Sequence, residues 1–180
     1  MIGFRRVRQR VLHRWHVWSL IEADCESPTG EQFIRTFVSS PGAVSIVAVD
    51  VHKQVLLIRQ YRATVDRVVW EIPAGMRDKL DEDPAVCGVR ELEEETGYTA
   101  DRVDLLTVFN PSAGIMDASH HVYLARDLRF VGTRLEGPEE AHLEVHWVAL
   151  DEAVALVERG EIMASSAVIG LLLAARRLAS

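Results

Sequence analysis

Residues 83–97 constrain the fold more than any other segment of the sequence. The segment begins with Asp83-Pro84, which supplies an N-cap side chain and a first-turn proline, and it ends at Gly97, a residue that commonly terminates helices. These signals predict a helix over about Pro84–Thr96, with Arg90-Glu91-Leu92-Glu93-Glu94-Glu95 in its last turns. Short Val/Ile/Leu-rich runs precede and follow this segment, so we expect the helix to pack against a β-sheet.

The carboxylates of this helix lie where local physics disfavours them. The C-terminal end of a helix dipole is negative and favours Lys or Arg. Glu91 is three residues from Glu94 and four from Glu95, and like charges at these spacings repel by about a few tenths of a kcal/mol per pair. A divalent cation such as Mg²⁺ takes oxygen ligands and would turn this repulsion into ligation. For the helix taken alone, an exposed acidic face is the alternative explanation.

Hydrophobic periodicity and turn residues predict the remaining elements. The first two strands flank the turn Ser27-Pro28-Thr29-Gly30, which indicates a small N-terminal β unit. The expected architecture is α+β, with an N-terminal β unit over residues 1–40 and the rest of the fold over residues 41–180. Strands are expected over residues 14–23, 32–39, 43–49, 54–59, 68–72, 103–109, 121–128 and 144–149, and two further helices over 151–159 and 165–178.

Composition excludes several classes of protein. With 180 residues, of which 48% are hydrophobic and 26% charged, the chain has the proportions of one packed domain with a short extra segment. Its 20 Lys and Arg residues against 27 Asp and Glu residues give a net charge of −7, which repels a polyanion such as nucleic acid. Any acidic ligand therefore needs local cations or a metal ion.

The sequence also carries expectations about location. Arginines near the N-terminus are not followed by an apolar stretch, so we expect no secretory signal and explain them by a solvated lead-in strand rather than by contact with nucleic acid or lipid. The charge-free stretch Ile162–Ala175 is shorter than the roughly 20 residues of a membrane-spanning helix and is expected to be a core helix. Cys25 and Cys87 are too few for a disulfide framework and lack metal-ligand spacing, which favours a cytoplasmic protein.

The acidic helix and the loop before it resemble the signature of the Nudix hydrolase family, G-x5-E-x7-R-E-U-x-E-E-x-G-U, in which U is apolar. From the first glutamate onward the match is complete, with a tyrosine in the final bulky position. The matching residues are Glu82, Arg90, Glu91, Leu92, Glu94, Glu95, Gly97 and Tyr98.

One departure from the signature lies between its glycine and its first glutamate. Six residues rather than five separate Gly75 from Glu82, so Asp81 would take the acidic position if the count began at the glycine. We keep Glu82 in register and expect a longer loop before the helix.

The resemblance implies both a fold and a chemistry. The fold is an α/β/α sandwich with a mixed sheet and a loop-helix-loop that carries the metal site. The activity is hydrolysis of a nucleoside diphosphate linked to another moiety, with Mg²⁺, or Mn²⁺ in its place, as cofactor. Transferred residue by residue, the metal ligands are Glu91, Glu94, Glu95 and the carbonyl oxygen of Ala74. Arg90 would steady the carboxylates, and Gly75 would allow a close approach of the backbone.

Features outside the signature resemble the ADP-ribose and sugar-nucleotide pyrophosphatases. They are Ser40-Pro41-Gly42-Ala43-Val44, Arg59-Gln60-Tyr61-Arg62, Trp70-Glu71-Ile72-Pro73-Ala74-Gly75 and the end of the expected strand near Val145, where a helix follows. This subfamily implies cleavage of ADP-ribose to AMP and ribose 5-phosphate. GDP-mannose or another nucleotide sugar is the alternative substrate, and a catalytically silent nucleotide sensor is the alternative class, against which the intact Glu91, Glu94 and Glu95 argue.

The subfamily also implies a homodimer in which the N-terminal β unit is the dimerisation arm. Trp15, Trp18 and Phe33 lie in this unit, where aromatic side chains either sandwich a nucleobase or form a dimer core. No nucleic-acid partner and no membrane partner is expected.

For the general base, the subfamily indicates a glutamate on the loop Gly137-Pro138-Glu139-Glu140-Ala141-His142. Glu139 is favoured and Glu140 is the second candidate, with His142 and His146 as further alternatives. A base must reach a metal-bound water, which is a geometric requirement that sequence alone does not test.

For substrate contacts, Arg35 and Arg62 are the expected phosphate-binding cations, because a guanidinium group pairs with phosphate oxygens through two hydrogen bonds. The loop Asn110-Pro111-Ser112-Ala113-Gly114 resembles the loop that lines the terminal ribose, with Gly114 and Gly75 as contacts. Ala113 replaces a proline often found there, which leaves the choice between ADP-ribose and a GDP-sugar open.

Overall fold

The computed structural model describes residues 3–79, 81–132 and 142–179. The chain divides into two compact units, one formed by Met1–Gly42 with Asn110–Ser119 and the other by Ala43–Phe109 with His120–Ser180. Each unit is described by itself below.

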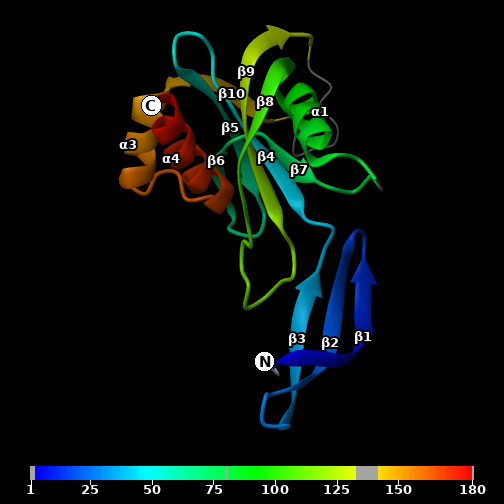
Figure 1. The fold of residues 1–180 in the computed structure, drawn as a ribbon. Helices are drawn as coiled ribbons and strands as arrows, with labels where there is room; N and C mark the ends of the chain where they lie inside the picture. Colours follow the sequence, from blue (N-terminus) through cyan, green and yellow to red (C-terminus); the bar gives the residue numbers. More distant parts are fainter. Residues whose placement is uncertain (1–2, 80, 133–141, 180) are drawn as a thin grey trace. The chain divides into compact units, whose positions relative to one another are not determined.

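The first unit is a three-stranded antiparallel sheet in the order β1-β2-β3 (Figure 1). Its strands are β1 (Arg5–Trp15), β2 (Trp18–Glu26) and β3 (Gln32–Ser39). The expected strand over residues 14–23 is wrong at its start, because the chain reverses between Trp15 and Trp18, which pair across a tight turn. His16 adopts φ 48° in this turn, which is a left-handed conformation. The residues on either side of His16 favour a strand, so the sequence does not indicate a turn at this position.

The arginine-rich start of the chain is explained by the partners of β1 on β2. Arg5 lies opposite Glu26 with an Nη2–Oε1 distance of 2.7 Å, and Arg10 lies opposite Glu22 at 2.6 Å. Arg8 is opposite Asp24 in the same register. Exposed ion pairs contribute little stability each, but opposite charges on facing strands favour one register over its neighbours. The lead-in strand expected from the sequence is therefore β1.

The described residues of the second unit form two sheets and three helices. A mixed sheet has the order β7-β4-β9-β8, in which β4 and β9 are parallel, and an antiparallel sheet has the order β10-β5-β6. The strands are β4 (Ala43–Ala48), β5 (Gln54–Arg62), β6 (Arg67–Glu71), β7 (Ala74–Met76), β8 (Tyr98–Phe109), β9 (His120–Phe130) and β10 (Glu144–Ala149). The helices are α1 (Pro84–Thr96), α3 (Leu150–Glu158) and α4 (Ser165–Ala179). None of the helices in the described ranges is long and apolar enough to cross a membrane.

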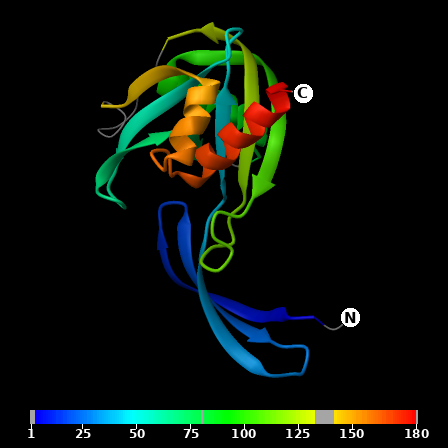
Figure 2. The ribbon, with the colours of Figure 1, turned by 90° about the vertical axis from the view of Figure 1, so that its left-hand side faces the viewer.

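The helices cover both faces of the sheets in this unit. Helix α1 lies on one side, and α3 and α4 lie on the other, where they cover the near face in Figure 2. Strand β4 is buried on both faces, as its continuous apolar sequence favours: Ile46 packs in the cluster with Leu92 of α1, whereas Val47 packs with Leu171 of α4. The expected α/β/α sandwich with a mixed sheet is confirmed.

The signals that delimit α1 act as the sequence predicts. The Asp83 side chain accepts a hydrogen bond from the Ala85 amide at 2.8 Å, and Gly97 ends the helix at φ 77°. Strand β7 was not expected, because Ala74 and Gly75 have low strand propensity, yet both residues pair with β4. Strands β5, β8 and β9 are longer than expected, since their ends carry polar residues that pattern alone assigns to loops.

Burial of His120 predicts an acid-sensitive fold. Its Nε2 lies 2.6 Å from the Ser45 hydroxyl, its ring stacks on Phe109, and burial lowers its pKa from 6.5 to about 4. Because the unfolded chain binds the proton first, the stabilisation is complete above pH 6.5 and is lost as pH falls towards 4, by at most about 3 kcal/mol.

Urea unfolding measured across this pH range tests the expectation. His120→Gln keeps a side chain that can bond to Ser45 and removes the titrating group, so its stability is expected to fall less steeply than that of the unmodified chain. His52→Gln, at an exposed turn, is the matched control. Parallel curves for all three proteins would contradict the assignment to His120.

Candidate active site

Two glutamates of α1 are held against the turn that leads into β7. A Cβ atom built on Gly75 would lie 2.0 Å from the Glu91 Cδ atom, so this carboxylate packs directly on the glycine backbone. Glu95 is buried, and its Oε2 accepts a hydrogen bond from the Ala74 amide at 3.0 Å. The pairing of β7 with β4 and the packing of α1 on β4 and β7 thus bring residues 16 and 21 positions apart into contact.

Arg90 binds three carboxylates of this site. Its Nε and Nη2 donate to the two oxygens of Glu82, each at 3.0 Å, and its Nη1 donates to Glu91 at 2.7 Å and to Glu94 at 2.9 Å. The hydrogen bonds to Glu82 raise the pKa of Arg90, and the same bonds lower the pKa of Glu82. Arg90 is therefore a fixed cation, and it holds one oxygen each of Glu91 and Glu94 beside the same nitrogen.

The extra residue before the helix is accommodated by a turn. Asp81 adopts φ 63°, a left-handed conformation open to aspartate, and the Glu82 amide lies 3.4 Å from the Lys79 carbonyl oxygen. Asp81 is exposed, whereas Glu82 makes the two-pronged pair with Arg90. This geometry supports the register that places Glu82, not Asp81, in the acidic position.

The donor set fits a hard divalent cation. Burial raises the pKa of Glu91, with a smaller contribution from the charge of Glu94, so a nearby cation would relieve the cost of ionising this group. The oxygen donors of Glu91, Glu94, Glu95 and the Ala74 backbone are of the type that Mg²⁺ prefers, and Gly75 leaves the backbone uncovered. Within the described ranges no three acidic, Cys or His side chains already stand at metal-binding spacing, and Glu91 and Glu94 each accept a hydrogen bond from Nη1 of Arg90.

Cys87 lies beside these acids but has no nucleophilic character. Its Sγ is 3.3 Å from Nη2 of Arg90 and 3.7 Å from the Met76 carbonyl oxygen. Burial, followed by its contact with Glu82, raises the pKa of the thiol to about 12. At neutral pH it is a small neutral side chain, as expected for a buried cysteine.

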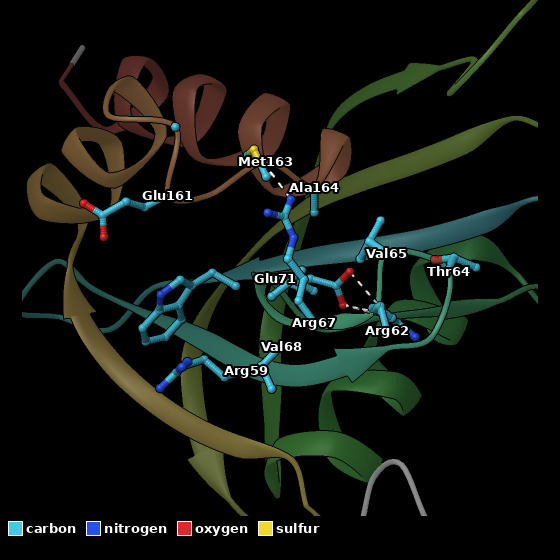
Figure 3. A pocket seen from close by; sticks show the side chains of 13 residues that line it. Arg59, Arg62, Thr64, Val65, Arg67, Val68, Glu71, Glu161, Met163 and Ala164 are labelled. Atoms are coloured by element: carbon cyan, nitrogen blue, oxygen red, sulfur yellow. Dashed lines mark hydrogen bonds and ion pairs between the residues drawn. The ribbon is translucent and has the colours of Figure 1, made fainter.

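The expected phosphate-binding arginines lie in different units. Arg62, on β5, donates from Nη2 and Nε to Glu71 of β6 at 2.8 and 3.1 Å (Figure 3). Glu71 also accepts a hydrogen bond from Gln60 at 2.8 Å. Glu71 lies in the Trp70–Gly75 element, but no local pattern in the sequence marks it as the partner of Arg62. Its contact with Arg62 depends on the register of the β5–β6 hairpin, which places Glu71 opposite Ile58.

Arg35 and Gly114 line one pocket of the first unit. The pocket has a volume of about 420 Å³ and also contains Arg6, Phe37 and Asp117. The Arg35 guanidinium lies over the Phe33 ring, 4.6 Å from its centroid. Two predicted substrate contacts that are far apart in sequence therefore lie together.

Glu139 and Glu140, the two candidates for the general base, lie outside the described residues, so their role stays a prediction. Of the alternatives, His142 is exposed. His146 lies edge-on to Trp70, 5.0 Å between ring centroids, and its Nε2 is 3.1 Å from Glu144. The structure thus places His146 on the β10-β5-β6 sheet among other side chains of that sheet.

Comparisons with known proteins show the family to which the chain belongs. A family model described as NUDIX domain matches residues 40–166. The chain is 40% identical over 164 residues to a CMP-5′-(N-acetyl-N-hydroxy-3-aminopropyl)phosphonate hydrolase of Streptomyces rubellomurinus, covering 91% of this chain and 78% of that protein. It is 39% identical over 146 residues to an ADP-ribose pyrophosphatase of Bacillus subtilis, covering 81% of this chain and 78% of that protein. The corresponding enzyme of Mycobacterium tuberculosis is 37% identical over 169 residues, covering 94% and 82%.

A solved structure shares the fold. The crystal structure of an ADP compounds hydrolase matches with a TM-score of 0.83 at 21% identity, covering 98% of this chain and 95% of that chain. Together with the Glu82–Arg90 pair and the Glu91 and Glu95 contacts to Gly75 and Ala74, the family match shows that the chain is an enzyme of the Nudix hydrolase family.

Proposed function

We propose that this enzyme cleaves the diphosphate of a nucleoside diphosphate sugar, with ADP-ribose as the first substrate and Mg²⁺ as the cofactor. Two of its relatives are named ADP-ribose pyrophosphatases. The observation that carries the proposal is the group of carboxylates around Arg90, with Glu91 and Glu95 packed on Gly75 and Ala74. Water would add to one phosphorus, the bridging P–O bond would break, and AMP and ribose 5-phosphate would form.

Each residue of the site has a separate role in this reaction. When bound, the metal ion neutralises charge on the diphosphate oxygens and acidifies a water molecule. Arg90 holds Glu91 and Glu94 through one nitrogen, and Glu95 fixes the Ala74 amide so that the carbonyl on the same turn keeps its direction. Arg62, held by Glu71, and Arg35 would bind phosphate oxygens, and Glu139 or Glu140 would take the proton of the attacking water.

A second substrate follows from the phosphonate hydrolase. That relative acts on CMP joined to a phosphonate, and it covers most of this chain. ADP-ribose, GDP-mannose and a CMP-phosphonate share a phosphorus anhydride attached to a nucleoside 5′-phosphate. They differ in the nucleobase and in the leaving group, so the bond to be cleaved is common to all three substrates.

A substrate panel tests the proposal. Purified protein is incubated with ADP-ribose, GDP-mannose and a CMP-phosphonate, each with Mg²⁺, with Mn²⁺ or with EDTA, and products are separated by ion exchange. We expect AMP and ribose 5-phosphate only with metal. A preference of about tenfold or more for another substrate corresponds to about 1.4 kcal/mol. Such a preference would change the substrate that we assign but not the type of reaction. Tight binding of ADP-ribose without any product would instead identify a nucleotide sensor.

We further propose that the enzyme is a homodimer joined through its N-terminal β unit. All eleven residues of β1 are exposed, and among them are the apolar side chains Val7, Val11, Leu12 and Trp15. β1 is also an edge strand, so its outer backbone groups are available for pairing. A three-stranded unit with this much exposed apolar surface favours a partner of the same kind.

Removal of residues before about Pro41 is expected to give a monomer whose substrate affinity falls more than its metal affinity. Sedimentation at micromolar concentration measures the assembly, and calorimetry measures both affinities. Arg177→Gln, on the exposed C-terminal turn of α4, is a control that leaves the arm intact. A full-length protein that is monomeric and fully active would contradict the proposal.

A further inference from the structure

Arg77 and His121 each keep one buried nitrogen without a hydrogen bond. Arg77 directly follows β7, and His121 is the second residue of β9. Within the described residues, neither Nε of Arg77 nor Nδ1 of His121 has a partner, although both atoms are buried. Buried polar atoms are almost always paired, so an unpaired one calls for an explanation such as a bound ligand or a functional role. The proposed hydrolysis, as derived so far, uses neither residue.

Both residues lie close to the backbone that carries the carboxylate site. Gly75, Val44 and His121 are in register across β7, β4 and β9, which are neighbours in the mixed sheet (Figure 1). Neighbouring strands are about 4.8 Å apart, so His121 lies about 10 Å from Gly75. Arg77 follows Gly75 by two residues, which is about 7 Å in an extended chain. A ligand held at Gly75 that extends by one further ring can therefore reach both side chains.

Tyr123 extends this polar group on the same side of β9. Its ring lies nearly parallel to that of His121, with 6.5 Å between the centroids and 11° between the planes. Its Cδ2 would lie 3.9 Å from a Cβ atom built on Gly88 of α1, so both rings are on the face that α1 covers. Burial, followed by the positive charge of Arg77, lowers the pKa of His121, and burial raises the pKa of Tyr123. Arg77 thus stands near two rings that are uncharged at neutral pH.

The outer polar atoms of these three side chains are open to a ligand. They are Nη1 and Nη2 of Arg77, Nε2 of His121 and the hydroxyl of Tyr123. None of them has a hydrogen bond within the described part of the chain, and none is among its buried atoms without a partner, so each reaches solvent. The nearby carboxylates are engaged elsewhere, since Asp78 lies 3.7 Å from Nη2 of Arg90 and Asp83 accepts from the Ala85 amide.

The mixture of these groups favours hydroxyl groups over a phosphate as the ligand. A guanidinium group only donates hydrogen bonds, whereas a neutral imidazole nitrogen and a phenol can donate or accept, according to the tautomer and the rotamer. A phosphate offers only acceptors and is matched by several cations, but Arg77 is the one cation of the three side chains. The hydroxyl groups of a sugar both donate and accept. One arginine beside two uncharged polar rings therefore suits a sugar.

We propose that Arg77, His121 and Tyr123 bind the sugar that lies beyond the diphosphate and determine which nucleotide sugar is hydrolysed. The inference rests on the proposed function, because it takes the diphosphate to be held at Ala74 and Gly75. The three residues contact the part of the substrate that does not react. They are therefore specificity-determining residues, and their effect depends on the hydroxyl groups of the leaving group.

The test compares ADP-ribose with adenosine 5′-diphosphate β-methyl ester, whose leaving group has no hydroxyl other than those of its phosphate. The measured quantity is the ratio of kcat/KM for ADP-ribose to kcat/KM for the methyl ester. His121→Phe and Tyr123→Phe keep the ring and remove only polar atoms, and each is expected to lower the ratio by about fivefold. Arg77→Met keeps the length of the side chain and is expected to lower the ratio by about tenfold or more. Arg102→Gln, an exposed arginine of β8, is the control and is expected to keep the ratio.

Equal losses on the two substrates would overturn the proposal, because damage to the fold or to the metal site lowers both values of kcat/KM alike. Such a result would leave the proposed function standing. If no member of the substrate panel is hydrolysed, calorimetry in EDTA measures the same ratio from the affinities for ADP-ribose and the methyl ester. A preference for ADP-ribose that Arg77→Met loses would support this proposal while the proposed function fails. No preference in the unmodified protein would overturn it.

Discussion

Replacing Gly75 by alanine is expected to lower the rate of hydrolysis by about 100-fold or more and to change the unfolding temperature by only about a few degrees. The new Cβ atom would lie 2.0 Å from Cδ of Glu91 and 2.2 and 2.3 Å from its two oxygens. This carboxylate is the far end of a flexible side chain, so it can rotate away and spare the fold. It then leaves the backbone of Ala74 and Gly75, and the metal-binding geometry is lost with it.

Gly88→Ala is the matched control for Gly75→Ala. Gly88 is a buried glycine of α1, and the nearest atom to its added Cβ is Cδ1 of Ile46, at an ordinary 3.6 Å. Activity is expected to be retained, with a gain in stability of up to about 1 kcal/mol from helix propensity.

The double variant Gly75→Ala with Glu91→Gln sharpens the test. Both changes act through the Glu91 carboxylate. The double variant is therefore expected to have a kcat/KM no lower than that of the less active single variant. Additive losses in kcat/KM, or full activity of Gly75→Ala, would contradict this account.

Local signals explain which elements could be predicted from the sequence. The bounds of α1 follow from Asp83, Pro84 and Gly97, which act within one turn of the helix ends. The reversal at His16 has no such signal, since the residues around it are all compatible with a strand and contain no Gly, Pro, Asn or Asp. The three-residue β7 forms because β4 offers it a partner, which no local pattern reveals.

The same distinction applies to the functional residues. The acids of α1 can be recognised in the sequence because their spacing on a helix is itself the signal. The partners of the arginines were not found, because each depends on strand register: Glu71 meets Arg62 only in the observed β5–β6 pairing, and Glu26 meets Arg5 only after two bulges in β1. Register is set by turns and packing of whole strands, so pairings across strands require the structure.

The second large effect concerns the acids themselves. Glu91→Gln and Glu95→Gln are each expected to reduce kcat/KM by roughly a thousandfold or more, since a metal ion stabilises transition-state charge by several kcal/mol and each 1.4 kcal/mol is a factor of ten. Glu93→Gln is the matched control on the same helix, because Glu93 is a neighbouring acid outside the predicted ligand set. Its activity is expected to stay within about twofold of the activity of the unmodified enzyme, because substitutions outside the ligand set and the core have small effects.

The two variants are expected to differ in stability when metal is absent. Burial raises the pKa of Glu91, so its ionised form costs stability at neutral pH, and Glu91→Gln is expected to unfold at the same or a higher urea concentration. Glu95 is buried and its Oε2 accepts a hydrogen bond from the Ala74 amide, so Glu95→Gln, which replaces one of the two acceptor oxygens by an NH2 group, is expected to lose about 1 kcal/mol. Urea unfolding in EDTA measures both. A destabilised Glu91→Gln together with an unchanged Glu95→Gln would reverse the roles, making the Glu91 pair with Arg90 the structural contact and the Glu95 bond to the backbone dispensable.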